Sequence, residues 1–255
     1  IKKVLDIVFS TSKNNKVAVV VSAFGKTTDK LFAGANEALE DITAAKEILT
    51  TIKQLHYQVI DDLIFINQEE VRKEVTALFS RLLSIYEGVF LLQELSDKTL
   101  AKVYSFGERL SSYIIANAAK ELFDATHQES RNLISTNNEY LNAQVNFKIT
   151  NKNISSFFDK NKHQVTLLGG FISSNINGET TTLGRGGSDF SASIYAAALN
   201  ADELQIWTDV SGMFTANPSV VKQAYPISEI SYEEAMELSH FGAKVLYPPT
   251  IQPSL

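Results

Sequence analysis

The sequence predicts an α/β fold in which helices cover both faces of a mainly parallel sheet. Three apolar runs, at residues 17–21, 165–168 and 204–207, are too short for globular helices and are rich in β-branched or bulky residues. Strands that are buried on both faces of a parallel sheet have this composition. A long region with helical spacing of its apolar residues separates the first two runs, so we expect a three-layer αβα sandwich.

The composition indicates a soluble globular domain. The 255 residues are 44% hydrophobic and 20% charged, which suits one large α/β core or two modest ones. With 23 basic and 29 acidic residues the net charge is −6, which argues against a nucleic-acid-binding surface. The absence of cysteine excludes disulfides, thiolate metal sites and a cysteine nucleophile. No apolar run approaches the roughly 20 residues of a membrane span and no signal peptide is recognisable, so we expect a cytoplasmic protein without membrane contact.

Helices are expected along most of the first half of the chain. Residues 1–8 read as a helix already under way, and residues 29–55 and 68–95 have apolar side chains three or four positions apart. In the last of these stretches the apolar positions are Val71, Val75, Leu78, Leu82, Ile85 and Val89. A further helix is predicted from about Gly107 to Leu122.

The second half of the chain contains shorter elements. Residues 175–183 read as a hairpin, because Asn177-Gly178 favours a type I′ turn between polar and β-branched residues. A helix with small residues on its packing face is expected around Phe190, Ile194 and Ala197. Ser231, followed three residues later by Glu234, matches a capping box that opens a helix through Leu238.

The segment from Gly169 to Asp189 carries the strongest chemical signal in the sequence. It ends one predicted strand in Gly-Gly-Phe and then presents Thr-Leu-Gly-Arg-Gly-Gly-Ser-Asp at the start of a helix. Glycines let backbone amides approach an anion, and a helix start offers unpaired N–H groups. Arg185 adds a planar fork for an anionic group and Asp189 supplies the opposite charge, as a zwitterionic amino acid requires.

Small or polar residues follow each of the three apolar runs. Ser22 follows the first run, Gly169 the second, and Thr208 with Asp209 the third. In open parallel sheets the ligand lies beyond the carboxyl ends of the strands. We therefore expect these residues to line one crevice.

Two other segments carry charged side chains whose role has a simpler alternative. In Ser105–Ser111 the carboxylate of Glu108 is predicted in the first turn of a helix. An acidic residue at that position is equally well explained by a structural role at the helix start. Lys244 lies among small and apolar residues and fits a phosphate contact, but an isolated lysine of this kind is more often a surface residue.

The sequence lacks the residues that several classes of site require. The four histidines have no metal-ligand spacing, so no protein metal site is predicted and a catalytic divalent ion would be Mg²⁺ held mainly by substrate phosphates. The nucleophile elbow of α/β-hydrolases is absent, and Gly25-Lys26-Thr27 lacks the upstream glycine of a Walker motif.

Taken in order, the motifs resemble the amino-acid kinase family and, within it, the catalytic domain of aspartokinases. The matching segments are residues 19–23 with Thr28, Ser105–Glu108, Gly169–Phe171, Thr182–Asp189, Trp207–Gly212 and Glu234–Leu246. They cover nearly the whole chain, and the last three blocks together are highly specific. The Glu-Ala-Met-Glu-Leu-Ser variant at residues 234–239 is most similar to aspartokinases fused to homoserine dehydrogenase.

The resemblance implies transfer of the ATP γ-phosphoryl group to the side-chain carboxylate of L-aspartate, the first step toward lysine, threonine and methionine. It implies a catalytic role for Arg185, Asp189 and Glu108. The residues that it implies for aspartate binding are Thr28, Glu108, Phe171, Arg185, Ser188 and Asp189. Those that it implies for ATP binding are Ser22, Gly186, Gly187, Thr208, Asp209, Phe214, Lys244 and Val245.

These roles are physically coherent. The acceptor carboxylate has a reference pKa near 4 and is ionised at neutral pH, so the reaction needs no general base. The barrier is the approach of one anion to another, and catalysis consists of positioning and charge neutralisation. Arg185 would hold a carboxylate of the substrate, Glu108 or Asp189 its ammonium group, and the amides of Gly186 and Gly187, with Mg²⁺, the phosphates.

The chain also departs from the family pattern. Family members begin with a strand and a Lys-Phe-Gly-Gly-Thr-Ser loop that this sequence does not contain, so we expect a catalytic domain truncated at both ends and weakly active or inactive by itself. Residues 1–160 would form the aspartate-binding part and residues 161–255 the nucleotide-binding part. Phe214, Asn217 and Ser219 replace residues that are common around the nucleotide. By similarity the protein is a homo-oligomer, with ACT domains and a fused dehydrogenase as candidates outside this segment.

Three alternatives remain open from the sequence. The first is another kinase on the same scaffold, acting on glutamate, acetylglutamate, carbamate or UMP. The second is a catalytically silent amino-acid-binding module. An NAD-binding oxidoreductase ranks third, because no Gly-x-Gly-x-x-Gly follows the first predicted strand.

Overall fold

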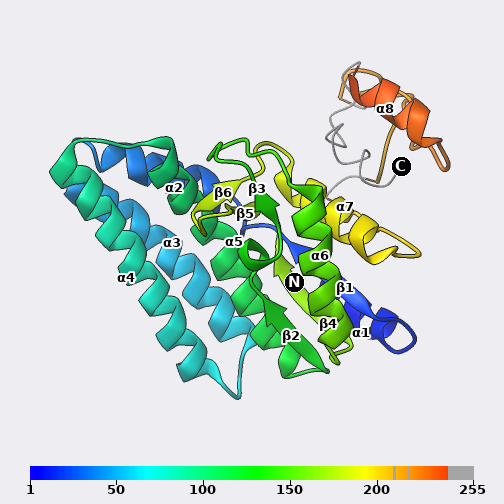
Figure 1. The fold of residues 1–255 in the computed structure, drawn as a ribbon, viewed down its shortest axis with the longest axis horizontal. Helices are drawn as coiled ribbons and strands as arrows, with labels where there is room; N and C mark the ends of the chain where they lie inside the picture. The colour runs from blue at the N-terminus through cyan, green and yellow to red at the C-terminus, as the bar shows by residue number, and fades with distance from the viewer. Residues whose placement is uncertain (209–210, 218, 241–255) are drawn as a thin grey trace.

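Two three-stranded sheets form the centre of the fold in the computed structural model, which describes residues 1–208, 211–217 and 219–240 (Figure 1). The first sheet has the order β1-β4-β2 and is entirely parallel. Its strands are β1 (Val17–Val21), β4 (Val165–Gly169) and β2 (Ala125–Gln128). Val21 pairs with Gly169 and Gln128 with Leu168, so the carboxyl ends of all three strands meet at one edge.

The third strand is not the one that the sequence predicts. Residues 204–207 are irregular, with Leu204 37% and Trp207 65% exposed, and in the described residues they belong to neither sheet. The prediction of a buried strand there is wrong, because the segment has neither a ladder partner nor a core to cover its apolar side chains. β2 takes the place beside β4 instead. Its Ala-Thr-His-Gln sequence has no apolar run, since a half-buried edge strand does not need one.

The second sheet has the order β3-β5-β6 and contains the predicted hairpin. It consists of β3 (Ser135–Thr136), β5 (Ile172–Asn175) and β6 (Thr180–Thr182), with β5 and β6 antiparallel. The turn is not type I′, which needs two residues with positive φ, because Gly178 has φ +75° and Asn177 does not share that conformation. The Asn175 side chain holds the turn by accepting hydrogen bonds of 3.0 Å from the amides of Asn177 and Glu179.

Helices supply most of the remaining structure. They are α1 (Lys2–Ser12), α2 (Thr27–Glu37), α3 (Ile42–Leu63), α4 (Gln68–Leu92), α5 (Asp97–Lys120), the 3₁₀ helix η1 (Ser130–Asn132), α6 (Phe147–Lys160), α7 (Gly187–Leu199) and α8 (Tyr232–His240). The stretch predicted as one helix over 29–55 is two helices, because Asp41 starts α3 by accepting from the amides of Thr43 and Ala44. The capping box at α8 is confirmed, since Ser231 and Glu234 exchange hydrogen bonds of 3.0 and 3.2 Å.

α5 begins ten residues before the predicted start. Ser96 caps it by accepting a hydrogen bond from the amide of Thr99 at 3.3 Å, and the helix runs without a break through Gly107. That glycine permits close packing, since a Cβ built on it would lie 2.9 Å from Cβ of Ala23. Glu108 therefore lies in the middle of a buried helix, and its predicted place in a first turn is wrong.

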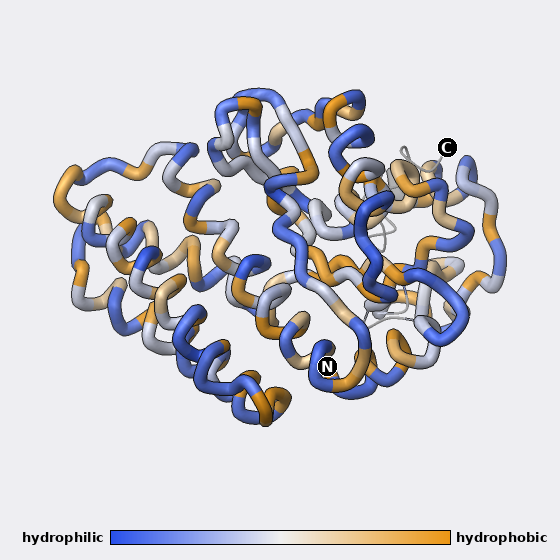
Figure 2. The backbone as a smooth tube through the Cα atoms, turned by 60° about the horizontal axis from the view of Figure 1, so that its bottom comes forward, coloured by the Kyte–Doolittle hydropathy of each residue, from blue (hydrophilic) through white to orange (hydrophobic). Residues whose placement is uncertain are grey.

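The two faces of the first sheet pack against different clusters. Val165 and Leu167 of β4 belong to the large core that α1 to α5 build, whereas Leu168 belongs to a second cluster with side chains from α6 and α7. This alternation along one strand places helices on both faces of the sheet. In Figure 2 the helices alternate between hydrophilic and hydrophobic residues along their length, as amphipathic helices do.

α4 differs from the expectation drawn from composition. By length and composition alone it is apolar enough to cross a membrane, although the sequence analysis expects no such segment. One third (33%) of its most apolar window is buried, and Phe79, Leu82 and Tyr86 lie in the core. A core helix meets the same criteria, so α4 is weak evidence for a membrane.

Tyr86 joins α4 to α2. Its ring is fully buried, and its hydroxyl donates a hydrogen bond of 3.0 Å to the carbonyl oxygen of Leu31. Gly34 permits this contact, because a Cβ built there would lie 2.8 Å from the hydroxyl oxygen. α2 is thus held against the helical layer by a buried polar contact and by packing.

Replacing Tyr86 by Phe is expected to lower the free energy of unfolding by about 1 kcal/mol, because a buried hydrogen bond is lost without loss of the ring. Urea denaturation of both proteins measures the difference. Tyr232→Phe is the matched control, since Tyr232 is 57% exposed and should unfold as the wild type does. Equal midpoints for all three proteins would contradict the role given to this hydroxyl.

Candidate functional site

The site is built where β1 and β4 end. The amide of Gly170 donates to the carbonyl oxygen of Val21 at 2.9 Å, so the two strands stay paired to their last residues. Ser22 continues from β1 and is exposed, while Gly170 continues from β4 and is buried. The parallel register therefore brings these two predicted positions to one edge, as the sequence analysis expects.

The glycine segment between β6 and α7 lies against this edge. Gly184 and Gly186 have φ values of +74° and +68°, which explains glycine at both positions. A Cβ at Gly170 would lie 2.7 Å from Cα of Ser188, and one at Gly187 would lie 2.7 Å from the Phe171 ring. Positive φ at two of these glycines and close packing of protein against protein at the other two thus explain the glycine-rich sequence.

The start of α7 has the features of an anion site. Gly186 occupies its N-cap and has no side chain, so no side-chain cap satisfies the first amides of the helix. Such amides and the positive end of the helix dipole favour a negatively charged group. Asp189 lies in the same first turn, half-buried, and burial raises the pKa of its carboxyl above the ordinary value.

Phe171 links the end of β4 to the glycine segment. Its backbone has φ +64°, a conformation that is uncommon for an aromatic residue. The amide of Phe171 donates to the hydroxyl of Ser191 at 2.9 Å and to the carbonyl oxygen of Gly187 at 3.2 Å. Two hydrogen bonds to α7 therefore hold the strained backbone in place.

Glu108 is the most unusual side chain of the site. It is 4% exposed, and its Cβ lies against Gly169, where a built Cβ would be 3.2 Å away. Oε1 accepts from the amide of Ala23 at a long 3.4 Å, and Oε2 is buried without a partner among the described residues. Burial raises the pKa of this carboxyl to about 8. A buried acid with a free oxygen at the end of a strand is suited to receive a cationic group.

The remaining residues predicted for the amino acid lie close to these. Thr28, in the first turn of α2, has its hydroxyl toward Gly107, where a built Cβ would lie 3.5 Å away. Ser188 packs on Gly170. Arg185 is exposed, and within the described part of the chain its guanidinium has no hydrogen-bond or ion-pair partner. Contacts therefore connect α2, α5, β4 and α7 into one site.

The predicted nucleotide residues are only partly described. Gly186 and Gly187 lie at the start of α7, as expected. Thr208 follows irregular chain and not a strand, so its predicted position beyond a third strand end is wrong. Phe214 forms a bridge with Pro226, in the segment that Figure 1 shows beyond α7. Asp209, Lys244 and Val245 lie outside the described residues.

Sequence reasoning missed one aromatic residue of the site. Tyr104 lies one turn before Glu108 on α5, with its ring 6.3 Å from the Phe171 ring and 6.1 Å from the Phe32 ring. Burial, followed by the nearby charge of Asp29, raises the pKa of its phenol. Tyr104 and Glu108 are four residues apart, which places them on the same face of a helix. This spacing is informative only when both residues are known to be helical.

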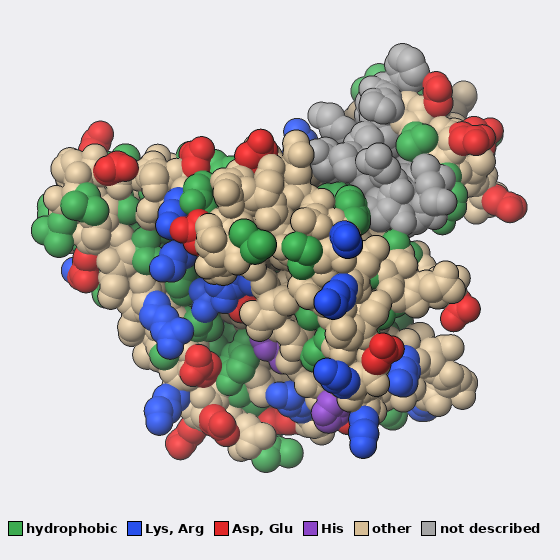
Figure 3. Space-filling view, in the orientation of Figure 1, with side chains coloured by type: hydrophobic (Ala, Val, Ile, Leu, Met, Phe, Trp, Pro, Cys, Tyr) green, Lys and Arg blue, Asp and Glu red, His purple; other side chains and the backbone are tan. Residues whose placement is uncertain are grey.

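Another cluster of charges serves the fold. Arg109 and Arg131 lie 3.5 and 2.7 Å from the same oxygen of Glu129, and burial followed by the charge of Arg131 lowers the pKa of Arg109 to about 10. On the face of the molecule that Figure 3 shows, basic side chains lie near a histidine in the middle of the view. The shared carboxylate already neutralises part of the charge, so the cluster ties η1 to α5.

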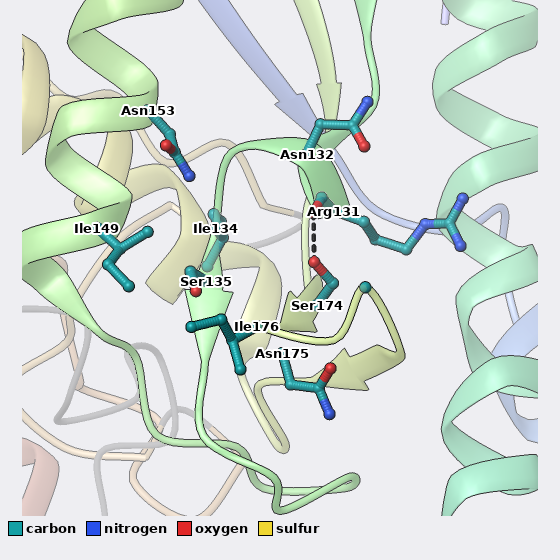
Figure 4. A pocket seen from close by; sticks show the side chains of 10 residues that line it. Arg131, Asn132, Ile134, Ser135, Ile149, Asn153, Ser174, Asn175 and Ile176 are labelled. Atoms are coloured by element: carbon teal, nitrogen blue, oxygen red, sulfur yellow. Dashed lines mark hydrogen bonds between the residues drawn. The ribbon is translucent and has the colours of Figure 1, made fainter.

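An open pocket of about 340 Å³ lies between α6 and the hairpin. Figure 4 shows Ile149 and Asn153 of α6 facing Ile176 of the turn, while the Arg131 side chain points away from them. The Ser174 hydroxyl closes one wall by donating to the carbonyl oxygen of Arg131 at 2.6 Å. None of the predicted site residues lines this pocket.

The segment 137–144 contacts the end of β6 and the glycine segment that follows it. The amide of Thr182 donates to the carbonyl oxygen of Tyr140 at 2.8 Å, and the amide of Ala143 donates to the carbonyl oxygen of Thr182 at 2.9 Å. Asn142 lies so close to Gly184 that a built Cβ would be 2.2 Å from its side-chain oxygen. The segment 137–144 therefore holds the last residue of β6 by two hydrogen bonds and contacts the following turn at Gly184.

Residues 1–254 match the amino acid kinase family, and the chain belongs to that family. It is 35% identical over 259 residues to a bifunctional aspartokinase/homoserine dehydrogenase of Buchnera aphidicola, covering 98% of this chain and 31% of that protein. It is 34% identical to an aspartokinase of Chlamydia pneumoniae, covering 95% of this chain and 52% of that one. The crystal structure of Escherichia coli aspartokinase III in complex with aspartate and ADP matches with a TM-score of 0.88 and 33% identity, over 98% of this chain and 55% of that chain. The chain thus spans about a third to a half of the length of these relatives.

Replacing Glu108 by Gln is expected to stabilise the protein at neutral pH. The folded-state pKa of about 8 lies above the unfolded value, so the buried acid stays protonated while the unfolded chain ionises, and stability falls as pH rises between the two values. Removing the titrating group should therefore raise the free energy of unfolding by about 2 kcal/mol at neutral pH and by much less near pH 4.

Thermal unfolding at neutral and acidic pH measures this effect. Glu233→Gln, which changes an exposed carboxylate of α8, is the matched control and should leave the melting temperature unchanged at both pH values. A lower melting temperature for Glu108→Gln at neutral pH would mean that the carboxylate stabilises the fold.

Proposed function

We propose that this chain is the catalytic region of an aspartokinase, which transfers the γ-phosphoryl group of ATP to the side-chain carboxylate of L-aspartate. The observation that carries the proposal is a buried Glu108 carboxyl group, whose Oε2 has no partner among the described residues, beside a helix start with the features of an anion site, in a fold that matches an aspartokinase crystallised with aspartate and ADP. The two features provide opposite charges for the two ends of an amino acid.

Arg185 and Glu108 divide the recognition of aspartate between them. The exposed guanidinium of Arg185 is free to bind a carboxylate of the substrate through two parallel hydrogen bonds. Glu108 receives the ammonium group and loses its proton as that charge arrives, because an adjacent cation lowers the pKa of a carboxyl. Thr28, Ser188 and Asp189 complete the polar lining, and Phe171 forms the wall between them.

Phosphoryl transfer then requires positioning and charge neutralisation. The acceptor carboxylate is already ionised, so no side chain has to remove a proton and no covalent enzyme intermediate forms. The start of α7, with Gly186 at its N-cap and Gly187 as its first residue, lacks a side-chain cap and suits a phosphate. The amide of Gly187 already donates to the carbonyl oxygen of Gly184 at 3.1 Å, so a phosphate there would take the place of this turn contact. Bound Mg²⁺ would supply charge neutralisation, and it would be held mainly by the nucleotide, since the described residues contain no cluster of metal-ligating side chains.

The wider assignments follow from the same proposal. Residues 1–160 form the aspartate-binding part and residues 161–255 the nucleotide-binding part of one three-layer αβα domain. Ser22, Thr208, Asp209, Phe214, Lys244 and Val245 are the further ATP-site residues. The working protein is cytoplasmic and homo-oligomeric, with regulatory ACT domains and a homoserine dehydrogenase as candidate neighbours in the same polypeptide.

A substrate panel tests the activity. The full-length protein is expected to consume ATP with aspartate and not with glutamate, acetylglutamate, carbamate or UMP. Arg185→Ala should raise the KM for aspartate by about 10- to 100-fold, because a bidentate charge-assisted contact is lost. Arg81→Ala, which removes an exposed arginine of α4, is the control and should leave KM unchanged. Preference for another acceptor, or no turnover with any, would refute the proposal.

Residues 1–255 alone should give little or no aspartyl phosphate. In the family the lysine of a Lys-Phe-Gly-Gly-Thr-Ser loop would stabilise the negative charge of the phosphoryl group during transfer. Residues 1–255 do not contain that loop. Hydroxylamine trapping of the acyl phosphate compares this segment with a version that carries such a loop upstream. Equal rates for the two would show that the loop is dispensable.

A further inference from the structure

His56, at the middle of α3, is a buried titratable group that the proposed reaction does not use. Its side chain is fully buried, and Nδ1 donates a hydrogen bond of 2.7 Å to the carbonyl oxygen of Ile52 one turn earlier. Nε2 is buried without a partner among the described residues. Such a ring costs stability compared with an apolar side chain of similar size, so its presence calls for an explanation.

The imidazole contacts two phenyl rings from different parts of the fold. The Phe79 ring of α4 meets it edge-on with the ring centroids 5.6 Å apart, and the Phe24 ring lies tilted with its centroid 5.2 Å away. Because Nδ1 is tied to its own helix, the imidazole cannot turn away from these contacts. Burial lowers the pKa of His56, so the ring stays neutral and packs as an aromatic group.

Phe24 belongs to the connection between β1 and α2, which carries the amino-acid end of the site. Within residues 22–26, the Phe24 side chain packs against the large core cluster, and the neighbouring Ala23 packs against Gly107 of α5. The preceding amide, of Ala23, binds Glu108, and the carbonyl oxygen of Phe24 accepts from the amide and hydroxyl of Thr27. Thr28 follows directly. The contact between His56 and Phe24 thus lies at the centre of the connection, with substrate positions on both sides.

We propose that His56 is a positioning residue, which fixes the connection 22–28 to the helical layer through the Phe24 ring and so sets the affinity of the site for the amino-acid substrate. The kinetic part of this inference rests on the proposed function. The structural part does not, since it concerns the order of the connection itself.

Hydrogen exchange of the free protein tests the structural part. His56→Leu removes the aromatic ring and keeps the core filled, and it should speed exchange in the peptide 22–28 by about tenfold, while the β4 peptide 165–169 exchanges as in the wild type. His56→Phe restores a ring against Phe24 and should return exchange to within about threefold of the wild type. Unchanged exchange in His56→Leu would overturn the proposal.

Val75→Ala is the matched control, because it removes buried volume from α4 and leaves the rings of His56 and Phe24 in place. Val75→Ala should lower the melting temperature and leave the hydrogen-exchange rate of peptide 22–28 unaltered. If His56 positions the connection, His56→Leu raises that rate whether or not the melting temperature changes. If Val75→Ala and His56→Leu accelerate the connection equally, His56 is merely structural and the proposal fails.

Kinetics complete the test on the full-length protein. His56→Leu should raise the KM for aspartate by about tenfold and change kcat by less than about threefold, with rescue by His56→Phe. A fall in kcat at unchanged KM would overturn the positioning role. If the wild-type protein does not phosphorylate aspartate at all, the proposed function fails, and the exchange experiment still decides whether His56 fixes the connection.

Discussion

The candidate site depends on how closely two helices approach the end of β4. Gly169 lies against Glu108 of α5, where a Cβ would make tight contacts of 3.2 Å, and the next residue, Gly170, lies against Ser188 of α7, where a Cβ would have no room. A larger residue at either glycine would move one helix away from the strand. The buried acid and the uncapped start of α7 would then no longer share one edge of the sheet, and the candidate site would lose its groups of opposite polarity.

This close packing also explains why the site is costly to the fold. It holds Glu108 where the carboxyl is protonated near neutral pH, and it holds Phe171 in a conformation that few aromatic residues adopt. His56 adds an unpaired ring nitrogen in the adjoining helical layer. Such exceptions to good packing and hydrogen bonding gather at functional sites, because binding there requires groups that the fold itself leaves unsatisfied.

The sequence predicts features that depend on local chemistry and misses those that depend on pairing. The runs at β1 and β4, the helical spacing of α4 and the Ser231–Glu234 capping box each contain their own signal, and the structure confirms them. β2 has no such signal, since its place comes from the ladder with β4. The residues at 204–207 show the opposite error, because β-propensity without a partner makes no strand.

The same distinction holds for the site. Glycine-rich composition correctly marks the start of α7. Gly107, by contrast, lies inside α5 and does not mark its start, and the absence of a Cβ there allows Ala23 to pack closely against the helix. The depth of Glu108 and the role of Tyr104 depend on that helix start. Local patterns therefore locate the binding segments, while burial and mutual contacts need the tertiary structure.

The tight contact between Gly184 and Asn142 has a consequence for how such proteins diverge. A larger residue at Gly184 would overlap the end of the Asn142 side chain and would also have to adopt a φ of +74°, so such a change requires Asn142 to move. Insertions or bulkier residues between residues 137 and 144 would shift the turn that carries Arg185, even though they lie on a surface connection. In relatives that act on a different acceptor, we therefore expect residues 137–144 and the turn at Gly184 to change together. Such changes could alter selectivity while the charged residues, such as Arg185, stay the same.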